Sequence, residues 1–197
     1  MAVVGRAEWR VARARLAAVE DEIARAREVL AEARRALPAV RVEGTYRFVT
    51  PVGPAGLADL FGGRRQLVVV HLMYGPQAGD LCAGCAVVAD GIAGLRHLAS
   101  RDTTLVAVSR APAALLEAAR VARGWAFPWV HCPDGFARAA GFLTGGQERT
   151  GVAVFLRDGS GEDPADVLLT YAAHGREVEQ VMNAYAWLDL TPLGRQD

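Results

Sequence analysis

The sequence carries a Cys-x-x-Cys motif at Cys82 and Cys85, with alanine and glycine between the two thiols. The motif follows an apolar run at residues 66–74 and precedes a stretch of helical periodicity over residues 81–100. A sulfur in the first turn of a helix lies beside unpaired N–H groups, whose partial positive charge favours the thiolate. Because the thiolate is the nucleophile, we predict that Cys82 attacks a substrate. Cys85 is then predicted to release it by forming an intramolecular disulfide.

Few charged groups are available to influence this dithiol. All 22 basic side chains are arginines, so no lysine amine can stabilise a thiolate or form a Schiff base. Asp80 is expected to cap the helix, where its negative charge opposes ionisation of the nearby sulfur. Since Ala83 and Gly84 carry no charge, we expect moderate activation, from the helix end alone.

A lone Cys-x-x-Cys pair is also compatible with half of a zinc site or with two core cysteines. Zinc takes four ligands, usually from two such pairs. The remaining candidate ligands are Cys132, His71, His97, His131 and His174. Only His131 and Cys132 are neighbours, and adjacent residues rarely both turn to one metal. The position of the pair between a strand and a helix favours a redox dithiol, with neither a metal nor a cofactor.

His71 and Cys132 each have two possible roles. His71, on the apolar run, is expected either to relay a proton to Cys85 or to be a hydrogen-bonded core histidine. Cys132 is either a third redox thiol or, as we favour, a buried apolar cysteine. Tyr74 and Trp129 are expected to pack around the site and to contact the substrate.

The elements that position these residues alternate between strands and helices after residue 45. Strands are predicted at 46–49, 66–74, 103–108, 127–130, 151–157 and 167–171, and helices at 81–100, 112–122 and 176–188. Strands separated by helices imply a parallel part of the sheet, and the last two strands, joined by a short turn at 158–161, should be antiparallel. This order predicts an α/β protein with a thioredoxin-like fold, a three-layer α/β/α arrangement around a mixed sheet.

Residues 6–37 form a separate pattern. Trp9, Leu16, Ile23, Leu30 and Leu37 recur every seventh residue, and small apolar residues lie three positions after the first four. Such a stripe seats one helix against another, so the helix is either a dimerisation arm or a cover for its own domain, with a slight preference for a homodimer. Its charged faces are expected to be solvated. We therefore divide the chain into an N-terminal helical arm, 1–40, and a thioredoxin-like domain, 41–197.

Composition narrows the class of partner. The formal net charge is zero and 52% of residues are hydrophobic, so neither nucleic acid nor a membrane is expected as a partner. The N-terminus has no apolar stretch of signal-peptide length, and we expect a cytoplasmic location. In a reducing cytoplasm three cysteines are not a disulfide framework, which again favours a reactive pair.

Several strings of this sequence resemble one bacterial family. They are the apolar run with its following Gly75-Pro76, the Cys82/Cys85 pair, and the segments 106–112, 124–130, 154–159 and 188–195. The family is domain-of-unknown-function family 899, described as thioredoxin-like and labelled a predicted dithiol-disulfide oxidoreductase. The resemblance implies a disulfide or peroxide substrate, on a protein or a small molecule, and an unidentified electron donor.

The sequence departs from related proteins in two places. Family members often have a proline between the two cysteines, which is absent here. Thioredoxins place a cis-proline opposite the dithiol, where this chain reads Arg149-Thr150-Gly151. Peroxiredoxins have an arginine near this place, which suggests that Arg149 stabilises a thiolate, although an exposed loop arginine is an equal alternative. Thr150 is assigned, with Tyr74 and Trp129, to substrate binding.

Two other functions stay open at the level of sequence. The fold can be retained in a non-catalytic or metal-binding accessory protein. Alternatively, the same dithiol can serve a specialised biosynthetic enzyme that acts on a sulfur-containing metabolite.

Overall fold

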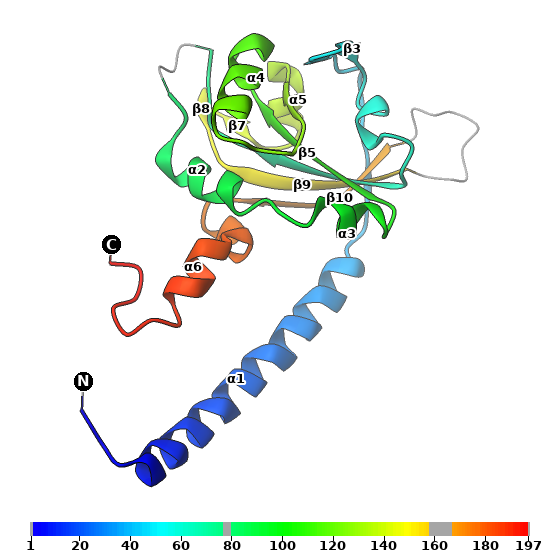
Figure 1. Cartoon of the computed structure of the whole chain (residues 1–197). Helices are drawn as coiled ribbons and strands as arrows, with labels where there is room; N and C mark the ends of the chain where they lie inside the picture. The colour runs from blue at the N-terminus through cyan, green and yellow to red at the C-terminus, as the bar shows by residue number, and fades with distance from the viewer. Residues whose placement is uncertain (1, 77–79, 158–166, 197) are drawn as a thin grey trace. The chain divides into compact units, whose positions relative to one another are not determined.

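The computed structural model describes residues 2–76, 80–157 and 167–196 (Figure 1). Contacts within the chain separate it into two units, residues 1–38 and residues 39–197. The first unit is the helix α1 (Arg6–Arg35), which confirms the predicted N-terminal helix, and none of its residues is buried. No helix in the described part of the chain is long and apolar enough to cross a membrane.

The second unit contains the sheet and the remaining helices. Its strands are β1 (Val40–Arg41), β2 (Phe48–Thr50), β3 (Gly53–Ala55), β4 (Gln66–His71), β5 (Thr103–Ser109), β6 (Trp129–His131), β7 (Leu143–Thr144), β8 (Gln147–Glu148), β9 (Gly151–Arg157) and β10 (Val167–His174). Its α-helices are α2 (Ala83–Asp90), α3 (Leu95–Ala99), α4 (Ala113–Ala122), α5 (Asp134–Ala139) and α6 (Asn183–Leu188), with 3-10 helices η1 (Asp59–Phe61) and η2 (Gly175–Val181).

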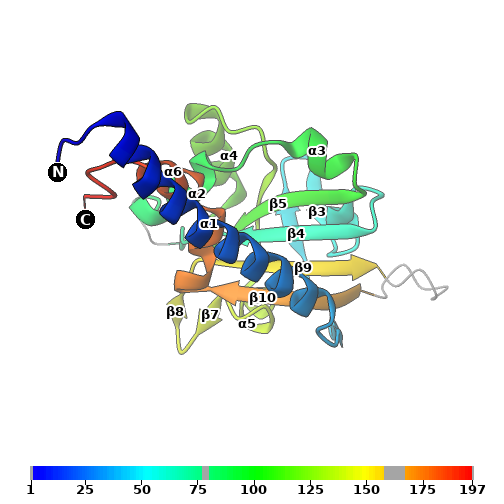
Figure 2. The same ribbon diagram turned by 90° about the horizontal axis from the view of Figure 1, so that it is seen from below.

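Eight of the strands form one mixed sheet in the order β1-β10-β9-β4-β5-β6-β2-β3 (Figure 2). β4 pairs with β5, and β5 with β6, in parallel, while β9 pairs antiparallel with β4 and with β10. This confirms the predicted parallel centre and the antiparallel closing pair. The predicted turn at residues 158–161 lies outside the described residues.

Alternation along the central strand divides the core into two halves. Leu67 and Val69 of β4 pack on one face with Phe136 of α5, whereas Val70 and Leu72 pack on the other face with residues of α2 and α4. Successive side chains of a strand point to opposite faces, so each half of the core lies between the sheet and one helical layer. The arrangement is the predicted three-layer α/β/α fold.

The structure corrects several predicted helices. The single helix predicted over residues 81–100 is two helices, because the chain leaves α2 at Gly91 and restarts α3 after Gly94, whose φ is +68°. The helix predicted over residues 176–188 consists of η2 and α6, separated at Met182, where ψ is 84°. The sequence analysis did not predict α5 or the β7–β8 hairpin.

Candidate active site

The two motif thiols lie where the chain passes from β4 into α2. Cys82 is the N-cap residue of α2 and is partly exposed, whereas Cys85, one turn later, is 0% exposed. The backbone N–H of Cys82 donates to the carbonyl of Met73 at 3.4 Å, which ties the start of the helix to the end of the strand segment. Both thiols are free. One sulfur therefore faces outward and its neighbour is held beneath it.

Cys85 has defined partners. Its Sγ accepts a hydrogen bond from the backbone N–H of Met73 at 3.1 Å and lies 2.9 Å from the Oγ1 of Thr150. Burial raises the pKa of Cys85 to about 11, and the charge and hydrogen bond of Cys82 act in the same direction. The bonds with Thr150 and Met73 lower it less than burial raises it. The buried thiol thus keeps its proton at neutral pH.

Asp80 does not cap the helix, contrary to the sequence-based expectation. Its Oδ1 accepts a hydrogen bond from the backbone N–H of Leu81 at 2.7 Å, one residue before the N-cap position held by Cys82. The α2 N-terminus has no side-chain cap. Its first N–H groups consequently have no carboxylate competing with the Cys82 sulfur.

A cleft of about 600 Å³ opens at Cys82. Its lining is mostly loop residues and polar side chains: Met73, Gly75, Pro76, Asp80, Leu81, Cys82, Arg110, Gly146 and Glu148. The Nε of Arg110 donates to Asp134 at 2.6 Å, and its Nη1 donates to Glu148 at 2.8 Å. These ion pairs raise the pKa of Arg110 and lower that of Asp134. A guanidinium bound by two carboxylates therefore lines the same cleft as Cys82.

Arg110 and Glu148 line this cleft but were not predicted as site residues. Arg110 directly follows β5, and Cys82 follows the adjacent parallel strand β4 after a loop. Since carboxyl ends of parallel strands meet at one edge of a sheet, this neighbourhood was a usable signal. Glu148 lies on the unpredicted strand β8, which follows Gly145 and Gly146, whose φ values are +59° and +81°. A Gly-Gly pair between two short strands is a hairpin signal, so this pair was usable as well.

Of the segment Arg149-Thr150-Gly151, which occupies the place of the thioredoxin cis-proline, the side chain of Thr150 lies beside the dithiol. Thr150 contacts Cys85, as given above. The side chain of Arg149 is exposed. Its backbone carbonyl lies 2.9 Å from the Nδ1 of His71, and its backbone N–H donates to the carbonyl of Phe142 at 2.8 Å. The cation that lines the Cys82 cleft is Arg110.

His71 lies on the opposite face of the sheet from Cys85. It follows Leu67 and Val69 in the alternation of β4, and its ring stacks on Phe142 with centroids 4.8 Å apart. Burial lowers the pKa of His71 to about 4, and its Nε2 has no hydrogen-bond partner among the described residues. The structure therefore does not bring the His71 ring to the Cys85 sulfur.

We predict that His71 makes the protein sensitive to acid. An unfolded histidine titrates near 6.5, so the stability contributed by neutral His71 is complete above that pH and is lost as pH falls toward 4. The loss over this range is about 3 kcal/mol in the free energy of unfolding. Urea unfolding at pH 7 and pH 4.5 measures it, and in His71→Leu the decrease should be smaller by that amount. An equal decrease in both proteins would contradict this assignment.

The remaining predicted residues, Trp129, Tyr74 and Cys132, are buried. Trp129 is 1% exposed, and its Nε1 donates to the Oγ of Ser109 at 2.9 Å. The ring centroids of Tyr74 and Trp129 are 6.0 Å apart, and both rings lie on the same face of the sheet as Cys85. Cys132 is on the other face, where burial raises its pKa to about 12. None of these three lines the cleft at Cys82.

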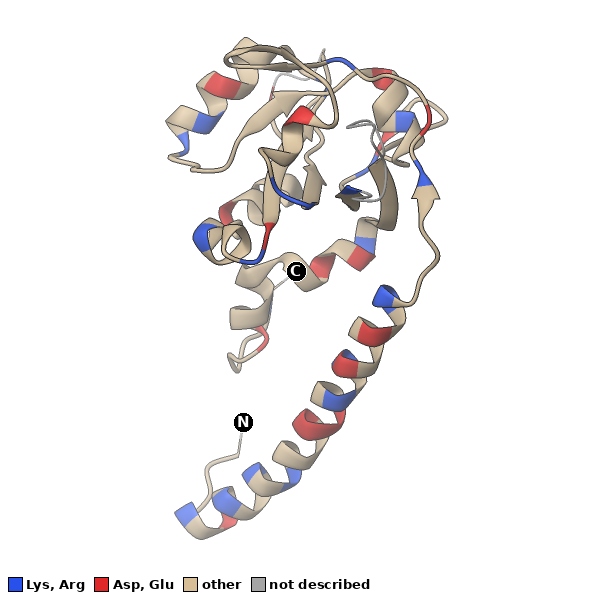
Figure 3. Ribbon diagram, turned by 90° about the vertical axis from the view of Figure 1, so that its right-hand side faces the viewer, with Lys and Arg blue, Asp and Glu red and all other residues tan. Residues whose placement is uncertain are grey.

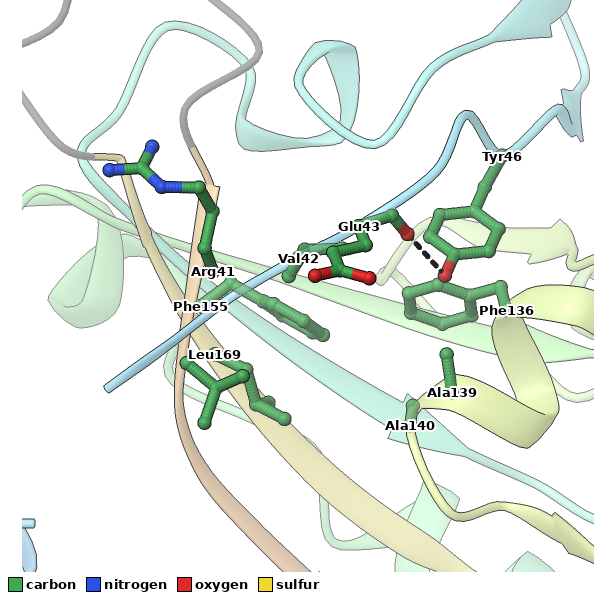
Figure 4. Close-up of a pocket in the computed structure, with 10 residues that line it drawn as sticks. Arg41, Val42, Glu43, Tyr46, Phe136, Ala139, Ala140, Phe155 and Leu169 are labelled. Atoms are coloured by element: carbon green, nitrogen blue, oxygen red, sulfur yellow. Dashed lines mark hydrogen bonds between the residues drawn. The ribbon is translucent and has the colours of Figure 1, made fainter. Parts of the chain in front are cut away.

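The described residues include no group of three or more His, Cys, Asp or Glu side chains arranged to hold a metal ion. A second cavity, of about 520 Å³, lies on the Phe136 face of the sheet (Figure 4). Its apolar floor includes Phe155 and Leu169, and Arg41 and Glu43 lie at its margin. It contains none of the cysteines.

Comparison with known proteins agrees with the fold. The family described as "Bacterial protein of unknown function (DUF899)" matches residues 1–197. Peroxiredoxin Q of Xanthomonas campestris is 17% identical with a TM-score of 0.50, covering 77% of this chain and 93% of that one. Peroxidoxin BcpB of Mycobacterium tuberculosis is 16% identical with a TM-score of 0.51, covering 75% and 94%. At such identities the similarity shows a shared thioredoxin-like fold. No curated protein matches the sequence.

Proposed function

This chain belongs to the bacterial DUF899 family, and from that membership and the dithiol geometry we propose that it is a cytoplasmic thiol-disulfide oxidoreductase. The observation that carries the proposal is the unequal pair at the start of α2. Cys82 is accessible from the cleft, and Cys85 is buried one turn below it with two hydrogen-bond partners. Such a pair separates the roles of attacking and resolving thiol.

In the proposed reaction, the Cys82 thiolate attacks one sulfur of a substrate disulfide. A mixed disulfide forms and the other substrate sulfur leaves as a thiolate. Cys85 then loses its proton and attacks the Cys82 sulfur, which releases the second substrate thiolate and leaves a Cys82–Cys85 disulfide. The substrate gains two electrons, and an external dithiol returns them to the protein. With a hydroperoxide, Cys82 becomes a sulfenic acid, an alcohol leaves, and attack by Cys85 releases water.

The geometry also supports the order of these steps. The charge of Cys82 and its hydrogen bond both raise the pKa of Cys85 in the reduced protein. Once Cys82 is bonded to the substrate, its sulfur carries no charge and is only a weak acceptor for the Cys85 thiol. Cys85 therefore ionises more readily when the mixed disulfide is present. The two thiols are thus not required to be ionised together.

Oxidation of the purified protein tests the proposal. We expect one equivalent of bis(2-hydroxyethyl) disulfide, or of cumene hydroperoxide, to remove two hydrogen atoms from the chain, and peptide mapping to place the bond between Cys82 and Cys85. Turnover with dithiothreitol as donor should follow. The matched control is Cys132→Ser, which alters a buried thiol on the other face and should leave both results unchanged. A stoichiometric metal ion held by both thiols, with no disulfide formed, would instead indicate an accessory protein.

Thr150 is proposed as a positioning residue for the resolving step. In Thr150→Val the Oγ1 that lies 2.9 Å from Cys85 is lost while the side-chain volume is kept. We expect the second step to slow about tenfold, the kinetic equivalent of one hydrogen bond of ~1.4 kcal/mol. Rapid acid quenching and mass spectrometry should then show the mixed disulfide accumulating.

Thr150→Ser is the control, because it retains the hydroxyl and should resolve the mixed disulfide at nearly the original rate. The first step, attack by Cys82, should be unchanged in both variants. A slower first step with a normal second step would assign Thr150 to substrate binding instead.

A further inference from the structure

The helix α1 presents an apolar stripe that is exposed along its length. Trp9, Leu16, Ile23 and Leu30 follow one another at intervals of seven residues, and each is between 46% and 56% exposed. Much of the stability of a protein helix comes from packing its apolar face, and a contiguous exposed patch of this kind marks an interaction surface. We define the stripe as these four residues together with Ala12, Val19, Ala26 and Ala33, which lie three positions after them.

Charged residues of both signs recur along α1 (Figure 3). Several of them lie along the two edges of the stripe. The edge that precedes the large apolar residues carries Glu8, Arg15 and Glu22. The edge that follows the small apolar residues carries Arg13, Glu20, Arg27 and Arg34, and position 29, which would face Arg34 on a parallel partner, is the uncharged Val29. In coiled coils, side chains at these two edges face each other across the interface and determine the choice and orientation of the partner.

We propose that α1 pairs with α1 of a second copy of this chain as a parallel, in-register, two-stranded coiled coil. In that arrangement a residue of the first edge faces the residue five positions later on the partner helix. The facing pairs are Glu8 with Arg13, Arg15 with Glu20, and Glu22 with Arg27, and two-fold symmetry repeats each of them. All six contacts join opposite charges.

An antiparallel dimer with full overlap lacks this complementarity. Its facing residues come from the same edge of both helices, so Glu20 meets Glu20, Glu22 meets Glu22, and Arg13 meets Arg27. Every one of these contacts joins like charges, which are unfavourable. The charge pattern therefore selects the parallel orientation, and the small Ala12, Val19, Ala26 and Ala33 allow the two helices to approach closely.

In the single chain, the Nη2 of Arg13 lies 2.7 Å from the Oε2 of Glu20 along one edge. Both side chains are more than 40% exposed, and such surface pairs contribute little to stability. Exchanging this ion pair for contacts across the dimer therefore costs little. The burial of the apolar stripe supplies the driving force for association.

Two charge-reversed variants of the full chain test the proposal. The first is Glu8→Arg/Arg15→Glu/Glu22→Arg, and the second is Arg13→Glu/Glu20→Arg/Arg27→Glu. In each variant all six contacts become repulsive, and we expect the dimer to dissociate with a constant about 100-fold higher than that of the original chain. An equimolar mixture of the two variants restores opposite charges at every contact and should form a heterodimer. Sedimentation equilibrium of the original chain, of each variant and of the mixture measures these constants.

The mixture guards against misfolding, because a variant that failed to fold could not recover with its partner. If the original chain is still monomeric at about 100 µM, the proposal is overturned, and the alternative that α1 covers its own domain is favoured. Unchanged dimers in both variants would equally exclude this interface.

Orientation is tested separately by a cysteine at position 12. Ala12→Cys in a Cys82→Ser/Cys85→Ser background should form a covalent dimer on mild oxidation, because parallel packing places the two thiols side by side. Antiparallel packing places Ala12 opposite Leu30, so absence of the cross-link in a chain that still dimerises would overturn the parallel arrangement.

Discussion

Replacing Cys82 with serine is expected to lower turnover of a disulfide substrate by on the order of 10³-fold or more, to the rate of the uncatalysed exchange. A serine hydroxyl is not ionised at neutral pH and does not replace the thiolate as nucleophile. The Cys85 thiol of this variant is 0% exposed and does not substitute for it. The rate of dithiothreitol oxidation with bis(2-hydroxyethyl) disulfide as acceptor measures the loss.

Cys85→Ser should fail at the next step. Its Cys82 still attacks, so the variant is expected to accumulate a stoichiometric adduct whose mass equals the chain plus one half of the disulfide. Cys132→Ser, at a buried position on the other face of the sheet, is the matched control and should turn over normally. The proposed mechanism is excluded if Cys82→Ser and Cys85→Ser both keep full activity.

Trp129→Ala is expected to have the largest effect on stability, with a loss of about 3–5 kcal/mol in the free energy of unfolding. The indole is 1% exposed and packs against Trp125, with ring centroids 5.5 Å apart. Its removal leaves a large cavity and also removes the hydrogen bond to Ser109. Denaturant unfolding at pH 7 measures the loss, and the thermal midpoint should fall by roughly 10 °C.

Trp129→Phe separates packing from substrate contact. The phenyl ring fills most of the site, and Ser109 keeps its bond to the carbonyl of Leu72, so the expected cost is about 1 kcal/mol. KM for the disulfide should be unchanged in this variant because Trp129 does not line the cleft. A raised KM with unchanged stability would return Trp129 to the substrate-binding role first assigned to it.

The strands were more predictable than the helix boundaries. β4, β5 and β9 are apolar runs buried at the centre of the sheet, and a run of that kind specifies a strand without reference to distant residues. The break between α2 and α3 was not predicted, although Gly91 and Gly94 lie in it. Isolated glycines are tolerated inside helices, so the glycines alone did not predict it.

Among the residues around the dithiol, those specified by local sequence were predictable and those placed by the sheet were not. Cys82 and Cys85 were identifiable because the motif and the strand-to-helix junction are both local in sequence. His71 was not assignable in this way, because its place on the face opposite Cys85 depends on the register of β4 within the sheet. A shift of one residue would have turned the ring toward the cysteine.

By itself, the sequence determined the α/β class, the long N-terminal helix and the position of the Cys82/Cys85 pair at a strand-to-helix junction, since each depends on periodicity or spacing within a short segment. Only the tertiary structure decided that Thr150 lies 2.9 Å from Cys85 and that Arg110 joins Glu148 at the cleft. These residues are separated by 65 and 38 positions in the chain. Their proximity follows from strand pairing across the sheet and from the placement of the β7–β8 hairpin, neither of which a short segment specifies.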